Sequence, residues 1–113
     1  MSRDDAYLFD ILDAARLVLE YVSDTTAEDF IVNIQLQDAV IRRFEIIGEA
    51  AKRVSDTARG QHPEVPWAKM IGLRNLCIHE YEQINLDVIW RTAHDDLPGL
   101  IEQLERIVPP DTP

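Results

Sequence analysis

The longest regular pattern in the sequence is an apolar stripe through its middle third. Its members lie four, four, three, four, three and four residues apart: Leu36, Val40, Phe44, Ile47, Ala51, Val54 and Ala58. Residues at this spacing share one face of an α-helix, so the stripe predicts one continuous amphipathic helix. Ile41 and Gly48 lie beside the stripe, so we expect a central helix with neighbours on more than one side. Small residues at Gly48, Ala50 and Ala51 predict the close approach of another helix, and Gly60 predicts the end.

Two further helices are predicted before this one. Residues 5–22 carry apolar residues at helical spacing, and a break at residues 23–26 follows. A threonine with an acid three residues later supplies a start like a capping box, either at Thr25 or at Thr26. The short segment that follows, about residues 26–33, is expected to present three apolar side chains: Phe30, Ile31 and Ile34.

The C-terminal half predicts two more helices. Pro66 suits the first turn of a helix that carries the residues around position 75. Asn85 can cap a last helix that continues to about residue 107. Pro98 lies inside it and is expected to kink it, or to divide it after a cap at Asp95 or Asp96.

Length and composition support one all-α domain. At 113 residues, with 46% hydrophobic and 28% charged residues and no strand-like alternation, the chain predicts an antiparallel bundle of four main helices plus a short one. We expect residues 1–108 to form it and residues 109–113 to be a flexible proline-rich tail. One cysteine excludes an intramolecular disulfide. No apolar run approaches the roughly 18 residues of a membrane span, so we expect a soluble, cytoplasmic protein.

The charge is unevenly distributed. The net charge of −10 is unusual for a nucleic-acid-binding protein. Residues 1–38 hold nine acids and two bases and residues 75–113 hold eight and two, but residues 39–74 hold four acids and seven bases. The bases of this middle segment are Arg42, Arg43, Lys52, Arg53, Arg59, Lys69 and Arg74. They favour either a functional basic surface or a solvated helix face with ion pairs such as Glu49–Arg53.

Four residues whose side chains can take part in catalysis or binding lie close together in the sequence: Arg74, Asn75, His79 and Tyr81. Arginine binds phosphate oxygens well, and histidine transfers protons near neutral pH. An arginine and a histidine together are the smallest set of side chains that metal-free RNA cleavage requires. On an ideal helix Asn75 shares a face with His79, whereas Arg74 shares one with Tyr81. A single straight helix therefore cannot aim Arg74 and His79 at one phosphate, which favours a homodimer, or a helix that is distorted or ends near His79. The alternative is a salt-bridging arginine and a partly buried histidine without a catalytic role.

No metal site is expected. His62 has no spaced partner, the spacing from Cys77 to His79 does not suit zinc, and His94 with Asp95 lacks the further ligands that a phosphohydrolase centre needs. Glu45 and Glu49 lie one helical turn apart, but nearby bases favour plain ion pairing. Glu49 or Lys52 is nevertheless a candidate for lining a groove beside the motif.

The motif and its flanks resemble the HepT toxins of the HEPN superfamily. The shared signature is Arg, four residues, His, any residue, Tyr, with a polar residue directly after the Arg; here these are Arg74, Asn75, His79 and Tyr81. The flanks that fit the family are residues 10–14, 39–52, 66–67, 88–90 and 97–100.

This resemblance implies a metal-independent endoribonuclease that acts as the toxin of a toxin–antitoxin pair. It also implies a homodimer with the motif at the interface, and no cofactor for RNA cleavage. The family's antitoxin is MntA, a minimal nucleotidyltransferase. An MntA-like partner would use ATP and Mg²⁺ to transfer AMP to Tyr81.

The residue types fit this chemistry. His79 would act as base on the ribose 2′-hydroxyl or as acid on the leaving oxygen, Arg74 would hold the phosphate, and Asn75 would orient the ring or the phosphate. The expected products are a 2′,3′-cyclic phosphate and a 5′-hydroxyl. AMP on Tyr81 would add an anion beside Arg74 and repel RNA. Two alternatives remain: a non-catalytic helical module that binds a nucleotide or a partner, and a plain structural bundle.

Overall fold

The computed structural model describes residues 2–77 and 85–109, and these residues are helical without a β-strand. The elements run in the order α1 (Arg3–Val22), α2 (Ala27–Val32), α3 (Ile34–Arg53), α4 (Asp56–Gln61), α5 (Trp67–Cys77), α6 (Leu86–Arg91), the π-helical turn η1 (Thr92–Asp96) and α7 (Leu97–Ile107). The predicted all-α class is confirmed. The tail at residues 110–113 lies outside the described residues, so its expected flexibility stays a prediction.

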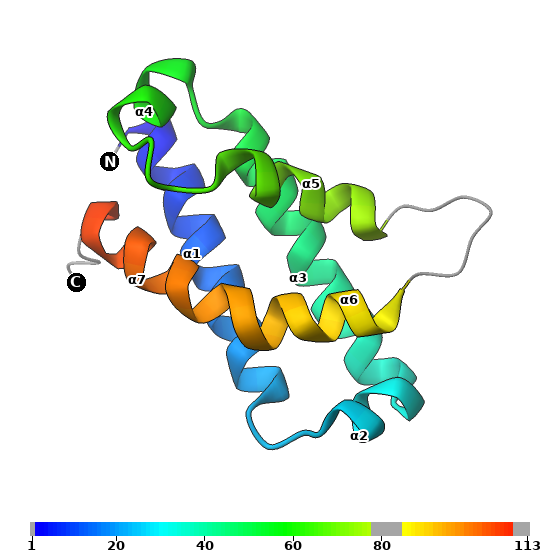
Figure 1. The fold of residues 1–113 in the computed structure, drawn as a ribbon. Helices are drawn as coiled ribbons and strands as arrows, with labels where there is room; N and C mark the ends of the chain where they lie inside the picture. Colours follow the sequence, from blue (N-terminus) through cyan, green and yellow to red (C-terminus); the bar gives the residue numbers. More distant parts are fainter. Residues whose placement is uncertain (1, 78–84, 110–113) are drawn as a thin grey trace.

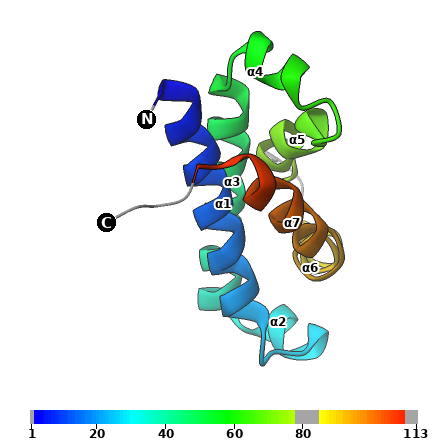
Figure 2. The same cartoon turned by 90° about the vertical axis from the view of Figure 1, so that its left-hand side faces the viewer.

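The helices form two layers. The long helices α1 and α3 pack side by side and run antiparallel (Figure 1). In the second layer, α5 packs on α3, while α6, η1 and α7 form one continuous rod that crosses α1. The turned view shows α5 and the rod on the same side of the α1–α3 pair (Figure 2). The four main helices of the predicted bundle are thus α1, α3, α5 and the rod.

The single helix expected from the apolar stripe is interrupted at Val54 and Ser55, which is a correction. α3 ends at Arg53, and Val54 is buried but extended, with φ −63° and ψ 135°. The Ser55 hydroxyl donates a hydrogen bond to Asp4 of α1 (2.6 Å) and accepts one from the Ala58 backbone N–H (3.1 Å), so it caps a separate helix, α4. The backbone N–H of Ser55 also donates to Asp4 (2.9 Å). A second short helix, α4, is therefore present in addition to the expected one, α2.

The predicted stop at Gly60 is also wrong. Gly60 lies inside α4, which ends at Gln61, and its φ is not positive. Glycine favours a helix end because it adopts positive φ at low cost. That advantage is not used here, because α4 ends without a left-handed residue.

In α2, one of the two possible caps is realised. The Thr26 hydroxyl accepts a hydrogen bond from the Asp29 backbone N–H at 3.1 Å. Phe30 is fully buried, as the apolar spacing suggested. Ile31 of α2 instead faces solvent, with 48% exposure, because a six-residue helix has only one face against the bundle, and Ile34, the first residue of α3, is 70% exposed.

The C-terminal rod begins as predicted but accommodates its proline differently. The Asn85 side chain accepts from the Val88 backbone N–H at 3.2 Å and caps α6. Before Pro98 the helix widens into η1, where the Leu97 N–H donates to the Thr92 carbonyl five residues earlier. A proline ring collides with the carbonyl four residues before it in an α-helix, and the wider turn relieves that collision. The rod is therefore neither divided by a side-chain cap at Asp96 nor ended.

The two layers share one hydrophobic core. Every helix except α4 contributes buried residues to this core. The loop before α5 also contributes one, Val65. Among the described residues no polar or charged side chain is buried. An exposed ion pair between Arg16 of α1 and Glu105 of α7 (2.6 Å) links the layers at the surface. Within the same ranges, each helix is too short or too polar to cross a bilayer.

Candidate functional site

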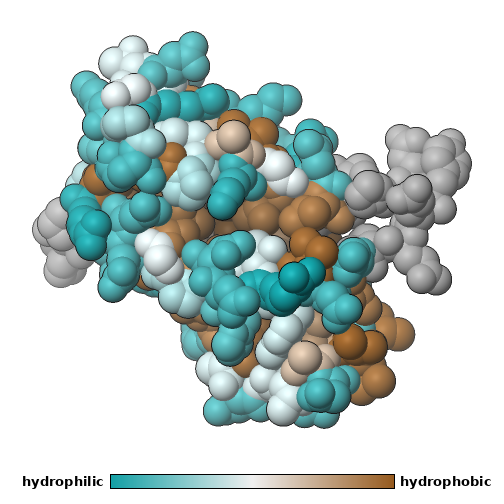
Figure 3. All heavy atoms as spheres, in the orientation of Figure 1, coloured by the Kyte–Doolittle hydropathy of each residue, from teal (hydrophilic) through white to brown (hydrophobic). Residues whose placement is uncertain are grey.

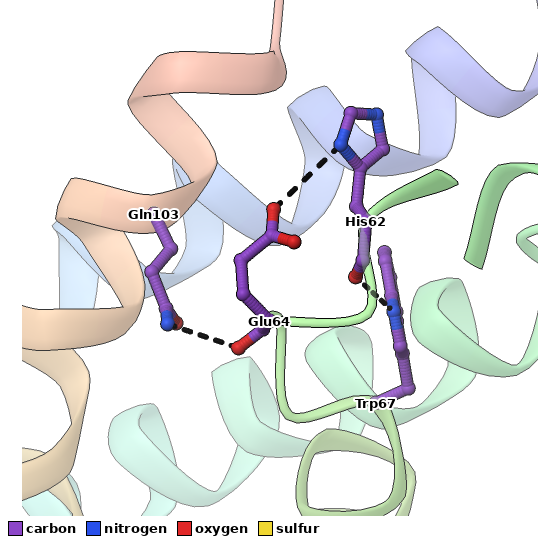
Figure 4. A network of polar contacts seen from close by, with 4 residues as sticks. All are labelled: His62, Glu64, Trp67 and Gln103. Atoms are coloured by element: carbon purple, nitrogen blue, oxygen red, sulfur yellow. Dashed lines mark hydrogen bonds and ion pairs between the residues drawn. The ribbon is translucent and has the colours of Figure 1, made fainter. Parts of the chain in front are cut away.

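The start of α5 is fixed by the loop before it. The Trp67 indole N–H donates to the His62 carbonyl (2.9 Å), and the Gln103 amide of α7 donates to the Glu64 carbonyl (3.0 Å) (Figure 4). His62 Nδ1 lies 3.7 Å from a carboxylate oxygen of Glu64 in the same loop. Pro66 directly precedes α5 and its carbonyl accepts from the Met70 N–H (3.0 Å). The loop thereby ties α5 to α7.

The contact between α3 and α5 centres on Gly48. A Cβ atom built on Gly48 would lie 2.9 Å from Arg74 Cβ, 3.0 Å from Arg74 N and 3.3 Å from the Ile71 carbonyl oxygen. These distances are too short for any side chain larger than hydrogen, because two of the three atoms belong to the backbone. The expected close approach of a helix at Gly48 is confirmed, and the residue that approaches is Arg74.

Arg74 is held by the residue that follows Gly48. Its Nε lies 2.7 Å from Glu49 Oε1, and both side chains are more than 40% exposed. The predicted pair of Glu49 with Arg53 is also present, but it is longer, with Arg53 Nη2 at 3.9 Å from Glu49 Oε2. The two guanidinium groups therefore share one carboxylate, and Arg74 has the shorter contact.

The structure places the remaining candidate residues as follows. Asn75 follows Arg74 on α5 and is exposed. Lys52 is exposed on α3, and its backbone carbonyl accepts from Arg59 (2.8 Å). His79 and Tyr81 lie outside the described residues, so the relation of these two side chains to Arg74 stays a prediction.

Two grooves flank this region. Glu49 lines a charged groove of about 230 Å³ between α1 and α3, together with Tyr7, Asp10, Arg42, Glu45, Ile46, Ala50 and Arg53. Lys52 is not part of that lining. Between α5 and the rod lies an apolar groove of about 290 Å³, which the sequence analysis did not anticipate. Its apolar lining appears as a hydrophobic band across the face of the molecule (Figure 3) and comes mainly from Met70, Leu73, Leu76, Leu97 and Leu100.

No group of three or more histidine, cysteine, aspartate or glutamate side chains within residues 2–77 and 85–109 is arranged to hold a metal ion. His94 lies 3.0 Å from Asp95 through Nδ1, and its ring stacks on Trp90 at 5.8 Å between centroids. Both contacts are local to the rod.

The family relationship follows from comparison with known proteins. The model of the family described as "Ribonuclease HepT-like" matches residues 11–107, which include α3, α5 and the rod. The chain belongs to the HepT-like ribonuclease family. The resemblance to HepT proteins of the HEPN superfamily is thereby confirmed.

Individual relatives cover almost the whole chain. A protein of Methanocaldococcus jannaschii named "Putative RNase" is 40% identical over 107 residues, which is 93% of this chain and 98% of that protein. A protein of Thermococcus cleftensis named "Probable ribonuclease HepT" is 39% identical over 101 residues, covering 89% and 92%. A "Putative RNase" of Caldanaerobacter subterraneus subsp. tengcongensis is 37% identical over 108 residues, 96% of either chain. No solved structure matches this chain.

The contact between Glu49 and Arg74 is the feature of the site that the sequence analysis missed. Glu49 was assigned to Arg53 because the two lie one helical turn apart, whereas Arg74 is 25 positions away. One signal was present in the sequence. Gly48 predicted where another helix approaches, and the side chain next to such a glycine is well placed to reach that helix.

Proposed function

We propose that this chain is a metal-independent endoribonuclease, active as a homodimer, and the toxin of a toxin–antitoxin pair in the cytoplasm. The observation that carries the proposal is the match of a ribonuclease family over residues 11–107, with relatives named as ribonucleases over nearly their full length. The exposed guanidinium of Arg74 supports it, because a phosphate clamp must reach solvent.

The proposed reaction is an internal transesterification of RNA. His79 removes the proton of a ribose 2′-hydroxyl, whose oxygen then attacks the adjacent phosphorus and displaces the 5′-oxygen of the next nucleotide. An imidazolium protonates that leaving oxygen. Arg74 binds the phosphate oxygens and offsets the charge that develops on them, and Asn75 orients the ring or the phosphate. The products are a 2′,3′-cyclic phosphate and a 5′-hydroxyl.

Helix geometry supports the proposed homodimer. On an ideal helix Arg74 and His79 point about 140° apart. Two copies of the motif facing each other across a two-fold axis would supply an arginine from one subunit and a histidine from the other. Two histidines per dimer would also allow one to act as base and the other as acid.

Activity would be controlled by modification of Tyr81. An MntA-like nucleotidyltransferase, with ATP and Mg²⁺, would join the Tyr81 phenolic oxygen to the α-phosphorus of ATP and release pyrophosphate. The added phosphodiester carries a negative charge. It would compete with RNA for Arg74, which shares a face with Tyr81 on an ideal helix.

RNA degradation by the purified, unmodified protein in EDTA tests the nuclease. We expect wild-type protein to produce fragments with cyclic phosphate ends, whereas Arg74→Ala and His79→Ala lose most activity, by about 10²–10⁴-fold for the histidine. Equal activity in all three proteins would contradict the proposal, because contaminating nuclease would then explain the cleavage.

Mass spectrometry tests the switch. After co-expression with a nucleotidyltransferase of the MntA type, the peptide that contains Tyr81 should gain one AMP, and Tyr81→Phe should remain unmodified and active. A wild-type peptide without AMP under these conditions would remove this part of the proposal.

One observation favours a second function. Glu49 already occupies one edge of the Arg74 guanidinium, and the net charge of −10 disfavours RNA. A non-catalytic module that binds a nucleotide or a partner protein would show ATP or partner binding that Arg74→Ala weakens, without RNA cleavage by the wild type.

A further inference from the structure

We propose that Glu49 is a positioning residue, which orients the Arg74 guanidinium for phosphate binding. This inference rests on the proposed nuclease function and deepens it. It assigns a role to a side chain of α3, outside the motif that begins with Arg74 on α5.

The contact atom determines what Glu49 does. A guanidinium group is planar and carries five N–H bonds, of which one is on Nε and four are on the two Nη atoms. Glu49 Oε1 lies 2.7 Å from Nε. The ion pair at Nε restrains the guanidinium group and involves a different atom from the two Nη atoms, which carry a pair of outward N–H bonds. That pair forms the outer edge with which arginine binds a phosphate through two parallel hydrogen bonds.

Consecutive residues of α3 hold both ends of the Arg74 side chain. Gly48 lets Arg74 Cβ approach so closely that an added Cβ would lie 2.9 Å away, while Glu49 holds the guanidinium at the other end. Both the Cβ end and the guanidinium end of the Arg74 side chain therefore contact α3. An ion pair this exposed contributes little to folding stability. Orientation is the effect that remains for it to supply.

The charge balance keeps the site attractive to an anion. Glu49 is shared with Arg53, whose Nη2 lies 3.9 Å from Oε2. These three side chains together carry one net positive charge, which is available to a phosphate that approaches Arg74.

The activity test compares Glu49→Ala, Glu49→Gln and Glu45→Ala. Misplacement of a catalytic group by about 1 Å costs up to about 100-fold, so we expect Glu49→Ala to lower kcat for RNA cleavage by at least about tenfold. KM should change much less, because the charge of Arg74 is retained. Glu49→Gln keeps the size of the side chain but removes the charge that forms the ion pair, so it should lose activity as Glu49→Ala does. Glu45, one turn earlier in the same groove, is the matched control and should behave as wild type.

Two measurements report on Arg74 directly. ¹⁵N relaxation at Arg74 Nε should report a restrained guanidinium in wild type and a more mobile one in Glu49→Ala and Glu49→Gln. If Glu49 acts through Arg74, then adding Glu49→Ala to the Arg74→Ala variant should produce no further loss of RNA affinity or activity.

The failure of this inference differs from the failure of the nuclease proposal. If Arg74→Ala cleaves RNA as well as wild type, the nuclease proposal fails whatever Glu49 does. If Arg74→Ala is inactive but Glu49→Ala keeps wild-type kcat, Glu49 does not position Arg74. Higher activity in Glu49→Ala would identify Glu49 as a competitor of phosphate and would overturn the inference as well.

Discussion

Among the surface contacts between described residues, two bear on the candidate site and on the end of α3. Glu49 of α3 meets Arg74 of α5, and Asp4 of α1 accepts two hydrogen bonds from Ser55, between α3 and α4. Water competes for exposed partners, so such contacts direct the geometry of side chains and turns more than they stabilise the fold. Substitutions at these residues should therefore distinguish effects on side-chain and turn geometry from effects on folding stability.

Arg74→Lys should show that shape matters as well as charge. Lysine keeps the positive charge but has no Nε–H and no fork of donors, so it cannot hold Glu49 and a phosphate in the arrangement that arginine allows. If the nuclease proposal holds, kcat should fall by about 10- to 100-fold, with a smaller change in RNA affinity at fixed salt. Wild-type kcat in this variant would mean that only the charge is used.

The Asp4–Ser55 contact predicts a pH dependence of stability. Hydrogen bonds from the Ser55 hydroxyl and backbone lower the pKa of Asp4 below its usual 3.8. The unfolded chain then binds more protons than the folded one in this range, so the stabilisation is present above pH 3.8 and is lost as the pH falls through the folded pKa.

Asp4→Asn should accordingly be less stable than wild type at neutral pH and should lose less stability on acidification. Thermal unfolding between pH 2.5 and 7 would measure both effects. Asp13→Asn, an exposed residue of α1, is the control. Identical acid profiles for wild type and Asp4→Asn would show that the contact does not affect folding.

At the scale of elements, the crossing of α3 and α5 fixes the site. α5 packs chiefly on α3, and the absence of a side chain at Gly48 permits the approach. On its other side α5 borders the apolar groove toward the rod. The position of Arg74 therefore depends on this crossing.

Gly48→Ala and Gly72→Ala should change stability in opposite directions. At Gly48 the new methyl group collides with the backbone of α5, and overpacking of this kind costs about 1–3 kcal/mol, only partly offset by better helix propensity. Gly72 is also helical, but a Cβ there meets nothing within 4 Å, so alanine should stabilise by about 0.4–1 kcal/mol. Urea unfolding of both variants measures the difference. A stabilised Gly48→Ala would contradict the packing described.

Helix periodicity predicted the main helices well, because each long helix buries one apolar face. The pattern failed where a contact came from far along the chain. The stripe from Leu36 to Ala58 carries no sign that Ser55 bonds to Asp4, 51 positions earlier, and so ends α3. The same limit explains why Glu49 was paired with Arg53 rather than with Arg74. The candidate residues of α5 were recognised from motif spacing, but their partners on α3 required the fold.

For the molecule as a whole, burial separates two kinds of apolar residue at the tip formed by α2 and the start of α3. Phe30 is fully buried and its ring lies 5.5 Å from that of Trp90, whereas Val32, two positions later, is 79% exposed. Of these two residues, only Phe30 connects this tip with the rod. The second contributes almost no buried surface to the described fold.

Phe30→Ala and Val32→Ser should therefore differ strongly. Loss of a fully buried phenylalanine costs about 3–5 kcal/mol, while an exposed valine can be replaced with a change within about 0.5 kcal/mol. Chemical denaturation of the purified protein distinguishes the two outcomes. A large loss with Val32→Ser would mean that Val32 is covered in solution, for example between subunits.

The wide turn η1 has a consequence for insertions and deletions among relatives. A π turn accommodates one residue more than a regular α-helix while the apolar faces on either side stay in register. Deletion of one residue between Thr92 and Asp96 would close the turn and bring the ring of Pro98 against the carbonyl four positions earlier. Relatives that are one residue shorter here should thus carry a residue other than proline at the position of Pro98.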